Sequence, residues 1–191
     1  MPKIIALTAP SGSGKTSIAR GVLEAIPETK FSISATTRPQ RPQEKHGVHY
    51  YFVSEEQFRA LIDDGQLIEY EEVYPGRFYG TLRSEVDRLA ETHPVLLDID
   101  VKGTLAVKHL YGDDALAVFI QPPSLDVLAE RLRARKTETE DTLRTRLDRA
   151  RTELTYADRF DAVVVNEDLD TAVEETLRLV RSFLNEEKVE G

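Results

Sequence analysis

A ten-residue segment near the amino terminus, TAPSGSGKTS (Thr8–Ser17), has the residue types of a loop that binds phosphate. It fits the pattern G-x-x-x-x-G-K-[ST], except that Ala9 stands at the first position. Gly12 and Gly14 permit positive φ angles and a close approach of the backbone, so successive N–H groups can converge on phosphate oxygens. An apolar run precedes the segment and a helical pattern follows it, which is the context that such a loop requires.

The same segment contains the two residues that would handle a triphosphate and its metal ion. The amine of Lys15 can reach the β- and γ-phosphates, and the hydroxyl of Thr16 can bind Mg²⁺. Alanine at the first position is expected to be harmless if its methyl group points away from the loop interior. The residues predicted to bind the triphosphate are Ala9, Pro10, Ser11, Gly12, Ser13, Gly14, Lys15, Thr16 and Ser17.

A second group of polar residues lies in the segment SATTRPQRPQEKHGVHYYFV, which contains Ser34, Arg38, Arg41 and Tyr50. Two arginines three positions apart, with a proline between them, suit bidentate clamping of one phosphate monoester. The tyrosine hydroxyl can add a neutral donor. A solvated charged loop with packed aromatic residues is the alternative that these residues leave open.

Two carboxylates follow the apolar run in LLDID (Leu96–Asp100). Alternation along a strand would place Asp98 and Asp100 on the same side of it. There they could orient water bound to Mg²⁺ or pair with groups of a substrate site, while two ordinary turn residues at a strand end are the alternative.

The composition excludes several classes of protein. The chain has 191 residues, of which 40 % are hydrophobic and 31 % charged, and this suits one globular domain. A formal net charge of −9 argues against a nucleic-acid or membrane-surface partner, and the lack of cysteine excludes disulfides and thiolate metal sites. No run approaches the roughly 20 apolar residues of a membrane span, and IIALTA is too short for a signal peptide, so we expect a cytoplasmic protein.

Strand and helix patterns alternate along the chain. Helical spacing follows the loop and recurs after Ser54 and Ser124 and near the carboxyl terminus, and Ser54 with Gln57 forms a capping-box pattern. This alternation predicts an α/β fold with a mostly parallel sheet flanked by helices. The predicted strands are Lys3–Ala9, Phe31–Ser34, Pro94–Asp100, Ala115–Gln121 and Asp161–Asn166, and the later helical repeats are Leu143, Leu147, Ala150, Leu154 and Val173, Leu177, Val180, Leu184.

Two blocks interrupt the alternation. Residues 32–82 are rich in turns and aromatic side chains, and they predict short, mainly antiparallel strands around one helix, as a lobe inserted after the first helix. Residues 126–155 form a long, helical and highly charged block.

Taken in order, these segments resemble the guanylate kinase family of P-loop nucleoside monophosphate kinases, which transfer the γ-phosphoryl group of ATP to GMP. The matching pieces are PSGSGKT, SATTRPQRPQEKHGVHYYFVS, LIEYEEV, FYGT, LLDID, ERLRARKTETED and VVNEDLD. The resemblance implies a core of residues 1–31, 83–125 and 156–191, a mixed α/β GMP-binding lobe of 32–82, and a helical lid of 126–155. It also implies Mg²⁺ bound with ATP, activity on dGMP as well as GMP, and a monomer or homodimer.

The resemblance assigns roles to individual residues. It implies that Arg38, Arg41, Tyr50 and Tyr79 hold the GMP phosphate, that Glu69, Ser34 and Thr81 read the base, and that Asp100 lies on the GMP side. It places Asn166 near the adenine ring of ATP, although a structural turn role is an alternative there. Lys15, Arg41, Arg131, Arg135 and Arg146 are the residues implied to stabilise the transferring phosphoryl group, for which no general base is required.

A carboxylate at Glu69 suits guanine, because it can accept hydrogen bonds from both N1–H and the exocyclic amine, whereas adenine presents a lone pair at N1. Two alternatives remain: a non-catalytic binding module of the same fold, and a kinase acting on another phosphorylated acceptor such as a ribose bisphosphate. The segment EVYPGRFYGT is one residue longer between Glu69 and Tyr79 than the family's shorter form, which leaves the alignment of Glu69 with Tyr79 and Thr81 open.

Overall fold

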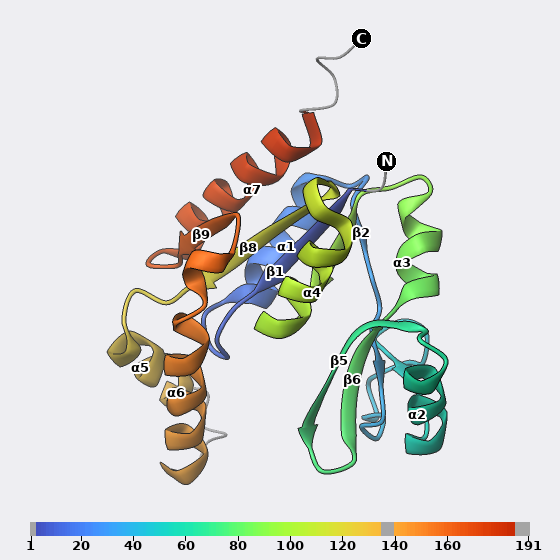
Figure 1. Cartoon of the computed structure of the whole chain (residues 1–191). Helices are drawn as coiled ribbons and strands as arrows, with labels where there is room; N and C mark the ends of the chain where they lie inside the picture. Colours follow the sequence, from blue (N-terminus) through green and yellow to red (C-terminus); the bar gives the residue numbers. More distant parts are fainter. Residues whose placement is uncertain (1–2, 135–139, 186–191) are drawn as a thin grey trace.

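The centre of the molecule is a five-stranded parallel sheet (Figure 1). The computed structural model describes residues 3–134 and 140–185. All neighbouring strands of this sheet are parallel. Helices bury the apolar runs of the three inner strands on both faces, as the sequence predicts, whereas the two edge strands leave Phe31, Val163 and Val165 exposed. In spatial order the strands are β2 (Lys30–Phe31), β7 (Val95–Asp98), β1 (Ile4–Thr8), β8 (Ala115–Gln121) and β9 (Ala162–Val165).

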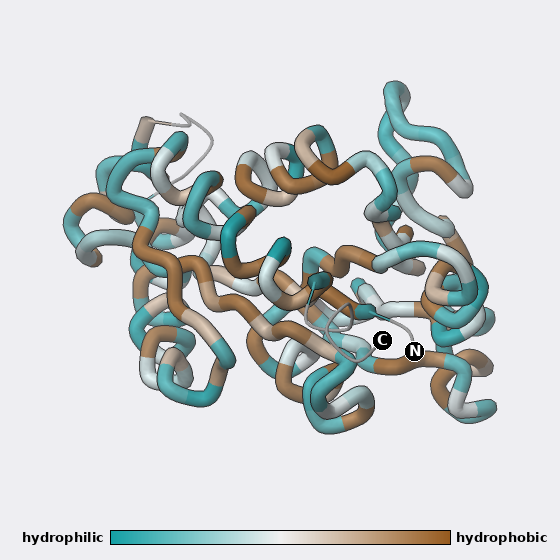
Figure 2. The backbone as a smooth tube through the Cα atoms, turned by 90° about the horizontal axis from the view of Figure 1, so that it is seen from above, coloured by the Kyte–Doolittle hydropathy of each residue, from teal (hydrophilic) through white to brown (hydrophobic). Residues whose placement is uncertain are grey.

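Alternate residues of β1 point to opposite faces of the sheet. Ile5 and Leu7 pack in one cluster with α1 (Lys15–Ala25) and α7 (Leu169–Asn185). Ile4 and Ala6 pack in a second cluster with α3 (Arg83–Ala90) and α4 (Val101–Tyr111). Figure 2 shows the hydrophobic strands running through the middle of the molecule. The predicted repeat in α7 is confirmed, since Val180 is buried and Val173, Leu177 and Leu184 pack against the first cluster.

A second sheet forms with α2 (Glu55–Asp63) a separate small lobe (Figure 1). The capping box of α2 is confirmed, because the Ser54 side chain accepts from Gln57 N and the Gln57 side chain accepts from Ser54 N. The second sheet has the order β4 (Tyr51–Phe52), β3 (Ala35–Thr36), β6 (Arg77–Leu82) and β5 (Leu67–Tyr74).

The strand directions of the small lobe differ in part from the sequence prediction. β3 pairs antiparallel with β6, and β6 pairs antiparallel with β5, as expected, but β3 and β4 are parallel. The long segment 37–50 between β3 and β4 allows the chain to return and run in the same direction. The predicted strand Phe31–Ser34 is also divided, because the chain leaves β7 after Ser32 N donates to Leu96 O and then enters the second sheet at β3.

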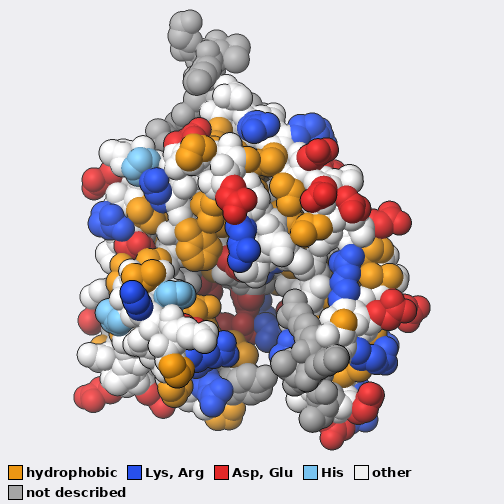
Figure 3. All heavy atoms as spheres, turned by 180° about the vertical axis from the view of Figure 1, so that it is seen from behind, with side chains coloured by type: hydrophobic (Ala, Val, Ile, Leu, Met, Phe, Trp, Pro, Cys, Tyr) orange, Lys and Arg blue, Asp and Glu red, His pale blue; other side chains and the backbone are white. Residues whose placement is uncertain are grey.

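Two further helices, α5 (Leu125–Ala134) and α6 (Glu140–Leu154), form the α5–α6 arm on the opposite side from the small lobe (Figure 1). Leu128 and Leu132 of α5 pack against Leu143 and Ala150 of α6, which confirms the predicted repeat. In the space-filling view the surface is hollowed between the small lobe and the arm, and acidic and basic side chains line the hollow (Figure 3). The remaining elements are two 3₁₀ turns, η1 (Gly112–Asp114) and η2 (Ala157–Arg159).

Candidate functional site

The loop between β1 and α1 has the backbone that its glycines predict. Gly12 has a φ of 98° and Gly14 a φ of 94°, and Gly14 is the N-cap of α1. Both positions also lack room for a side chain: a Cβ on Gly12 would lie 3.0 Å from Leu128 and Leu132, and one on Gly14 would overlap the amide of Asn166. The loop is therefore shaped by its glycines, and its backbone N–H groups lie at the positive end of the α1 dipole.

Ala9, the departure from the loop pattern, packs against the cluster formed by β1, α1 and α7. Its methyl group is thus in contact with the core. Alanine at this position leaves the two glycines that shape the loop unchanged.

Lys15 is held by the neighbouring strand β7. Its Nζ lies 2.5 Å from Asp98 Oδ1 and donates to Ile99 O at 2.8 Å. Thr16, the next residue, is exposed in the first turn of α1. An amine and a carboxylate therefore meet at the carboxyl edge of the parallel sheet, with a hydroxyl on the next residue of the chain, and this edge is where ligands bind in this type of fold.

The α5–α6 arm brings one of the predicted arginines to the loop and another to Asn166, a residue that supports the loop backbone. Arg146 donates from NH1 to Ser11 Oγ at 2.8 Å. Arg131 donates to Asn166 O at 2.9 Å, and Asn166 in turn donates from Nδ2 to Ser13 O at 2.7 Å. Asn166 is buried and its amide supports the loop backbone. The third predicted arginine, Arg135, lies outside the described residues.

Asp100 does not share a strand with Asp98, so the expectation that both carboxylates lie on the same side of one strand is wrong. β7 ends at Asp98, and Asp100 is the N-cap of α4, where its Oδ1 accepts from Gly103 N at 2.6 Å. The change from strand to helix separates the two carboxylates. Asp98 pairs with Lys15 at the loop, and Asp100 lies beside the small lobe.

On the small lobe, Glu69 and Thr81 lie directly opposite each other on β5 and β6, and Glu71 and Tyr79 form the next pair on the same face. Thr81 Oγ1 donates to Glu69 Oε1 at 2.5 Å. A register shift between Glu72 and Tyr74 accommodates the longer segment. The alignment of Glu69 with Thr81 that the sequence left open is therefore present.

Glu69 is an unusual carboxylate. Burial raises its pKa to about 7, and the nearby Asp100 and Glu71 carboxylates add to the rise, while the hydrogen bond from Thr81 opposes it. Gly103 makes the close approach of α4 possible, since a Cβ there would lie 2.7 Å from Glu69 Oε2 and 3.0 Å from Asp100 Oδ1.

The residues predicted to clamp a phosphate monoester gather at one end of the small lobe. The Arg38 guanidinium lies 5.4 Å from the Tyr50 ring centroid, and the Tyr50 and Tyr79 rings are 5.9 Å apart. Glu44, which the sequence reasoning missed, accepts from both terminal nitrogens of Arg38, at 2.7 and 3.0 Å, and from Arg41 N at 2.9 Å. Hydrogen bonds from Arg38 and Arg41 lower the pKa of Glu44 to about 2.

Arg41 is exposed, and Ser34 is half-buried with its carbonyl accepting from Tyr51 N at 2.9 Å. Of the predicted monophosphate site, Arg38, Tyr50 and Tyr79 are in contact, and Glu69 and Thr81 form a separate pair.

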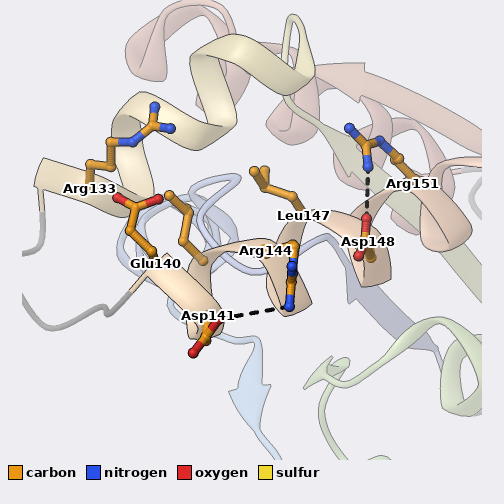
Figure 4. A pocket seen from close by; sticks show the side chains of 8 residues that line it. Arg133, Glu140, Asp141, Arg144, Leu147, Asp148 and Arg151 are labelled. Carbon is orange, nitrogen blue, oxygen red and sulfur yellow. Dashed lines mark hydrogen bonds and ion pairs between the residues drawn. The ribbon is translucent and has the colours of Figure 1, made fainter.

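A surface groove lined mainly by charged side chains lies between α5 and α6, on a different side of α6 from Arg146 (Figure 4). Arg144 lies 3.7 Å from Asp141, and Arg151 lies 2.7 Å from Asp148. Pairs of this kind on an exposed helix face contribute little to stability. We do not assign these arginines to the site.

Within residues 3–134 and 140–185, no group of three or more His, Cys, Asp and Glu side chains could by itself hold a metal ion. The same residues include no helix long and apolar enough to cross a bilayer.

Comparison with known proteins gives a consistent family. The model of the guanylate kinase family matches residues 1–183. A guanylate kinase of Salinibacter ruber is 63% identical over 182 residues, which cover 95% of this chain and 97% of that protein, and one of Chlorobium luteolum is 48% identical over 96% and 93%. The crystal structure of a guanylate kinase from Anaplasma phagocytophilum matches with a TM-score of 0.75 at 32% identity, over 95% of this chain and 85% of that chain.

Proposed function

This chain belongs to the guanylate kinase family and transfers the γ-phosphoryl group of ATP to GMP, and we propose that it does so in the hollow between the small lobe and the α5–α6 arm. The observation that carries this location is that one short segment after β7 serves two chemically different half-sites, since Asp98 pairs with Lys15 and Asp100 lies beside Glu69. The glycine loop with Lys15 lies at the edge of the parallel sheet, and the Glu69–Thr81 pair lies on the face of β5 and β6.

On the donor side, the loop residues 9–17 bind the phosphates of ATP. Their N–H groups and the α1 dipole attract anionic oxygens, and Lys15 exchanges Asp98 for the β- and γ-phosphates. Arg146 and Arg131, already in contact with the loop and with Asn166, approach the same phosphates from the arm. Arg135 is proposed to join them.

On the acceptor side, Glu69 accepts hydrogen bonds from guanine N1–H and the exocyclic amine, with Thr81 holding its other oxygen. Ser34 and Asp100 border the base. Arg38, Arg41, Tyr50 and Tyr79 hold the phosphate, for which Arg38 releases Glu44. These contacts do not involve the ribose 2′-hydroxyl, so dGMP is proposed as a second acceptor.

The residues present fit a magnesium ion that arrives with ATP. Thr16 and Asp98 offer a hydroxyl and a carboxylate, the hard oxygen ligands that Mg²⁺ prefers, and Mg²⁺ is usually bound by one or two such groups together with phosphates. When bound, the ion neutralises charge on the phosphates. Thr16 is proposed as a direct ligand, and Asp98 and Asp100 would act through water.

Phosphoryl transfer here relies on position and charge. The GMP phosphate is already ionised, so no residue needs to remove a proton from it. Lys15, Arg41 and the arm arginines Arg131, Arg135 and Arg146 stabilise the charge that develops on the transferring group.

We propose the core, lobe and lid boundaries given above, with residues 126–155 closing over the site to exclude water. Since ATP and GMP are nucleotides of the cytoplasm, we propose that compartment, with the enzyme acting as a monomer or homodimer.

The test is a coupled assay of ADP release with GMP, dGMP, AMP, CMP, UMP and a ribose bisphosphate, each with Mg²⁺ and with excess chelator. We expect turnover with GMP and dGMP, and its loss with chelator. Preference for a ribose bisphosphate would favour a different acceptor, and GMP binding without turnover would favour a non-catalytic module. Turnover that survives chelation would contradict the metal proposal.

The ionisation of Glu69 gives a prediction for pH. Its pKa of about 7 means that the carboxylate needed by guanine is present above pH 7 and is lost as the pH falls below it. The fraction of Glu69 in the carboxylate form falls about tenfold between pH 8 and pH 6, because its pKa lies midway between the two. The Kd for GMP should therefore rise about tenfold over this range from Glu69 alone.

Calorimetric titration of GMP across this range would measure the effect. The phosphate of GMP also titrates near pH 6, so Glu69→Gln is the control. This variant should keep the part of the pH dependence of the Kd that comes from the GMP phosphate and lose the part that comes from Glu69. An identical pH dependence in the variant and in the unaltered protein would contradict the role of Glu69.

Replacing Gly103 should impair the binding of GMP far more than it impairs the stability of the fold. Gly103→Ala should lower the free energy of unfolding by about 1 kcal/mol, because crowding against Glu69 and Asp100 costs ~1–3 kcal/mol and the helix preference of alanine offsets only ~1 kcal/mol of it. The new Cβ would press on Glu69 Oε2, 2.7 Å away, and should raise the KM for GMP about tenfold without changing the KM for ATP. Thermal unfolding and steady-state kinetics measure both, with the exposed neighbour Lys102→Ala as control. An unchanged KM for GMP would show that the Glu69 carboxylate need not occupy this place.

A further inference from the structure

Arg149 connects the arm to the small lobe. It lies on α6, and its NH2 donates to both carboxylate oxygens of Glu71 on β5, at 2.8 and 3.1 Å. Its Nε donates to Glu153 Oε1 at 2.8 Å, and NH2 lies 4.0 Å from Asp100 Oδ2. One guanidinium thus joins a helix of the arm, a strand of the lobe and the N-cap of a core helix.

The surroundings of Arg149 are strongly acidic. Glu69 and Glu71 lie on the same face of β5, Asp100 raises the pKa of both, and Glu153 approaches from α6. Burial raises the pKa of Glu71 and Asp100 raises it further, while Arg149 opposes both effects. Ionised carboxylates that lie close together repel one another, so the guanidinium of Arg149 among them stabilises their positions.

The side chains involved are only partly exposed, which makes this pair different from an ordinary surface pair. The exposed fraction is 45% for Arg149, 30% for Glu71 and 14% for Glu153. Arg149 NH2 serves both Glu71 oxygens while Nε serves Glu153, so one planar guanidinium holds two carboxylates at fixed angles, which the single ammonium of lysine does not reproduce.

Arg149 and Arg146 serve different parts of the hollow. They lie three positions apart on the same side of α6, yet Arg146 contacts Ser11 in the loop and Arg149 contacts Glu71 beside Glu69. A single helix therefore reaches both half-sites through two separate arginines.

We propose that Arg149 is a positioning residue for the acceptor, which holds Glu71 and Asp100 in place beside Glu69 and keeps the lobe aligned with the arm when GMP binds. The proposal rests on the assignment of the Glu69 face to the guanine base. It does not require Arg149 to touch either nucleotide.

The experiment compares Arg149→Met, Arg149→Lys, Glu71→Gln and the double variant Glu71→Gln/Arg149→Met with the unaltered chain. The measurements are KM for GMP, KM for ATP, kcat, and the Kd of GMP by calorimetry without ATP. Arg149→Met should raise the KM and Kd for GMP about five- to tenfold and leave the KM for ATP within about twofold. Arg149→Lys should recover part of the loss, and the double variant should be no worse than Arg149→Met, because both changes break the same contact.

Arg151→Met is the matched control, since it removes an arginine from the other face of α6 whose partner is Asp148 (Figure 4). It should leave all four quantities unchanged. Equal losses for ATP and GMP in Arg149→Met, or fully additive losses in the double variant, would overturn the proposal. So would an unchanged Kd for GMP.

These outcomes are separable from a failure of the catalytic assignment. An unaltered chain that binds GMP without phosphorylating it would contradict the proposed function. The calorimetric comparison of the variants would still decide the role of Arg149.

Discussion

Lys15→Met is expected to lower kcat on the order of 10³-fold while the chain remains folded. Removing one preorganised donor from a developing oxyanion costs ~10²–10³ in rate, and Lys15 carries a full charge. Its position supports this magnitude, because its Nζ lies at the carboxyl edge of the sheet, held by Asp98 and Ile99 O, beside the turn formed by Gly12 and Gly14. Steady-state kinetics of GMP phosphorylation would measure the loss.

The variant also leaves the Asp98 carboxylate without its cation, so folding must be checked separately. Thermal unfolding should show a modest decrease, and Asp98→Asn combined with Lys15→Met should restore stability without restoring activity. Lys45→Met, an exposed lysine of the small lobe, is the control for loss of charge alone. A Lys15→Met enzyme with kcat within tenfold of the original would contradict the assignment of Lys15 to the transferring phosphate.

The loop could be predicted from the sequence because its physical causes are local. The strand, the two glycines and the helix start all lie within Ile4–Ala25, and the positive φ angles follow from residue type. The capping box at Ser54 and the repeats of α7 are local in the same sense. Such features need no knowledge of how distant segments pack.

Asp100 shows where local patterns stop being sufficient. Alternation along LLDID predicts that a strand continues to Asp100, but aspartate is also a preferred N-cap, and the helix α4 that it starts has a weaker sequence signal. The two interpretations place the carboxylate in different environments. The structure has Asp100 as the N-cap, with its Oδ1 accepting from Gly103 N, and the packing of α4 near Glu69, allowed by Gly103, places that carboxylate beside the small lobe.

The contact of Glu71 with Arg149 joins residues 78 positions apart and was not predicted. On each segment alone, a glutamate on a strand and an arginine on a charged helix are typical solvated side chains. Their role depends on the placement of the arm relative to the lobe, which no pattern within either segment encodes.

Glu69→Gln should reduce kcat/KM for GMP on the order of 10²-fold and change the KM for ATP by less than about threefold. Thr81 Oγ1 donates to Glu69 Oε1, so in the variant it will hold the amide oxygen and leave the amide NH₂ facing the base. That NH₂ meets N1–H and the exocyclic amine of guanine, donor against donor, and each buried donor left without an acceptor costs ~1–3 kcal/mol. Kinetics with GMP and with AMP would measure the change.

The same variant should improve AMP, because the amide can donate to the N1 lone pair of adenine that a carboxylate repels. The ratio of kcat/KM for GMP to kcat/KM for AMP should therefore fall, because the value for GMP decreases and the value for AMP increases. A variant that was merely misfolded would lose activity with both nucleotides. Glu72→Gln on the opposite face of β5 is the matched control, since its amide oxygen can still accept from Gly76 N. If Glu69→Gln kept the original preference while Glu72→Gln altered it, the base would be read from the other face of the strand, and the acceptor site would have to be moved there.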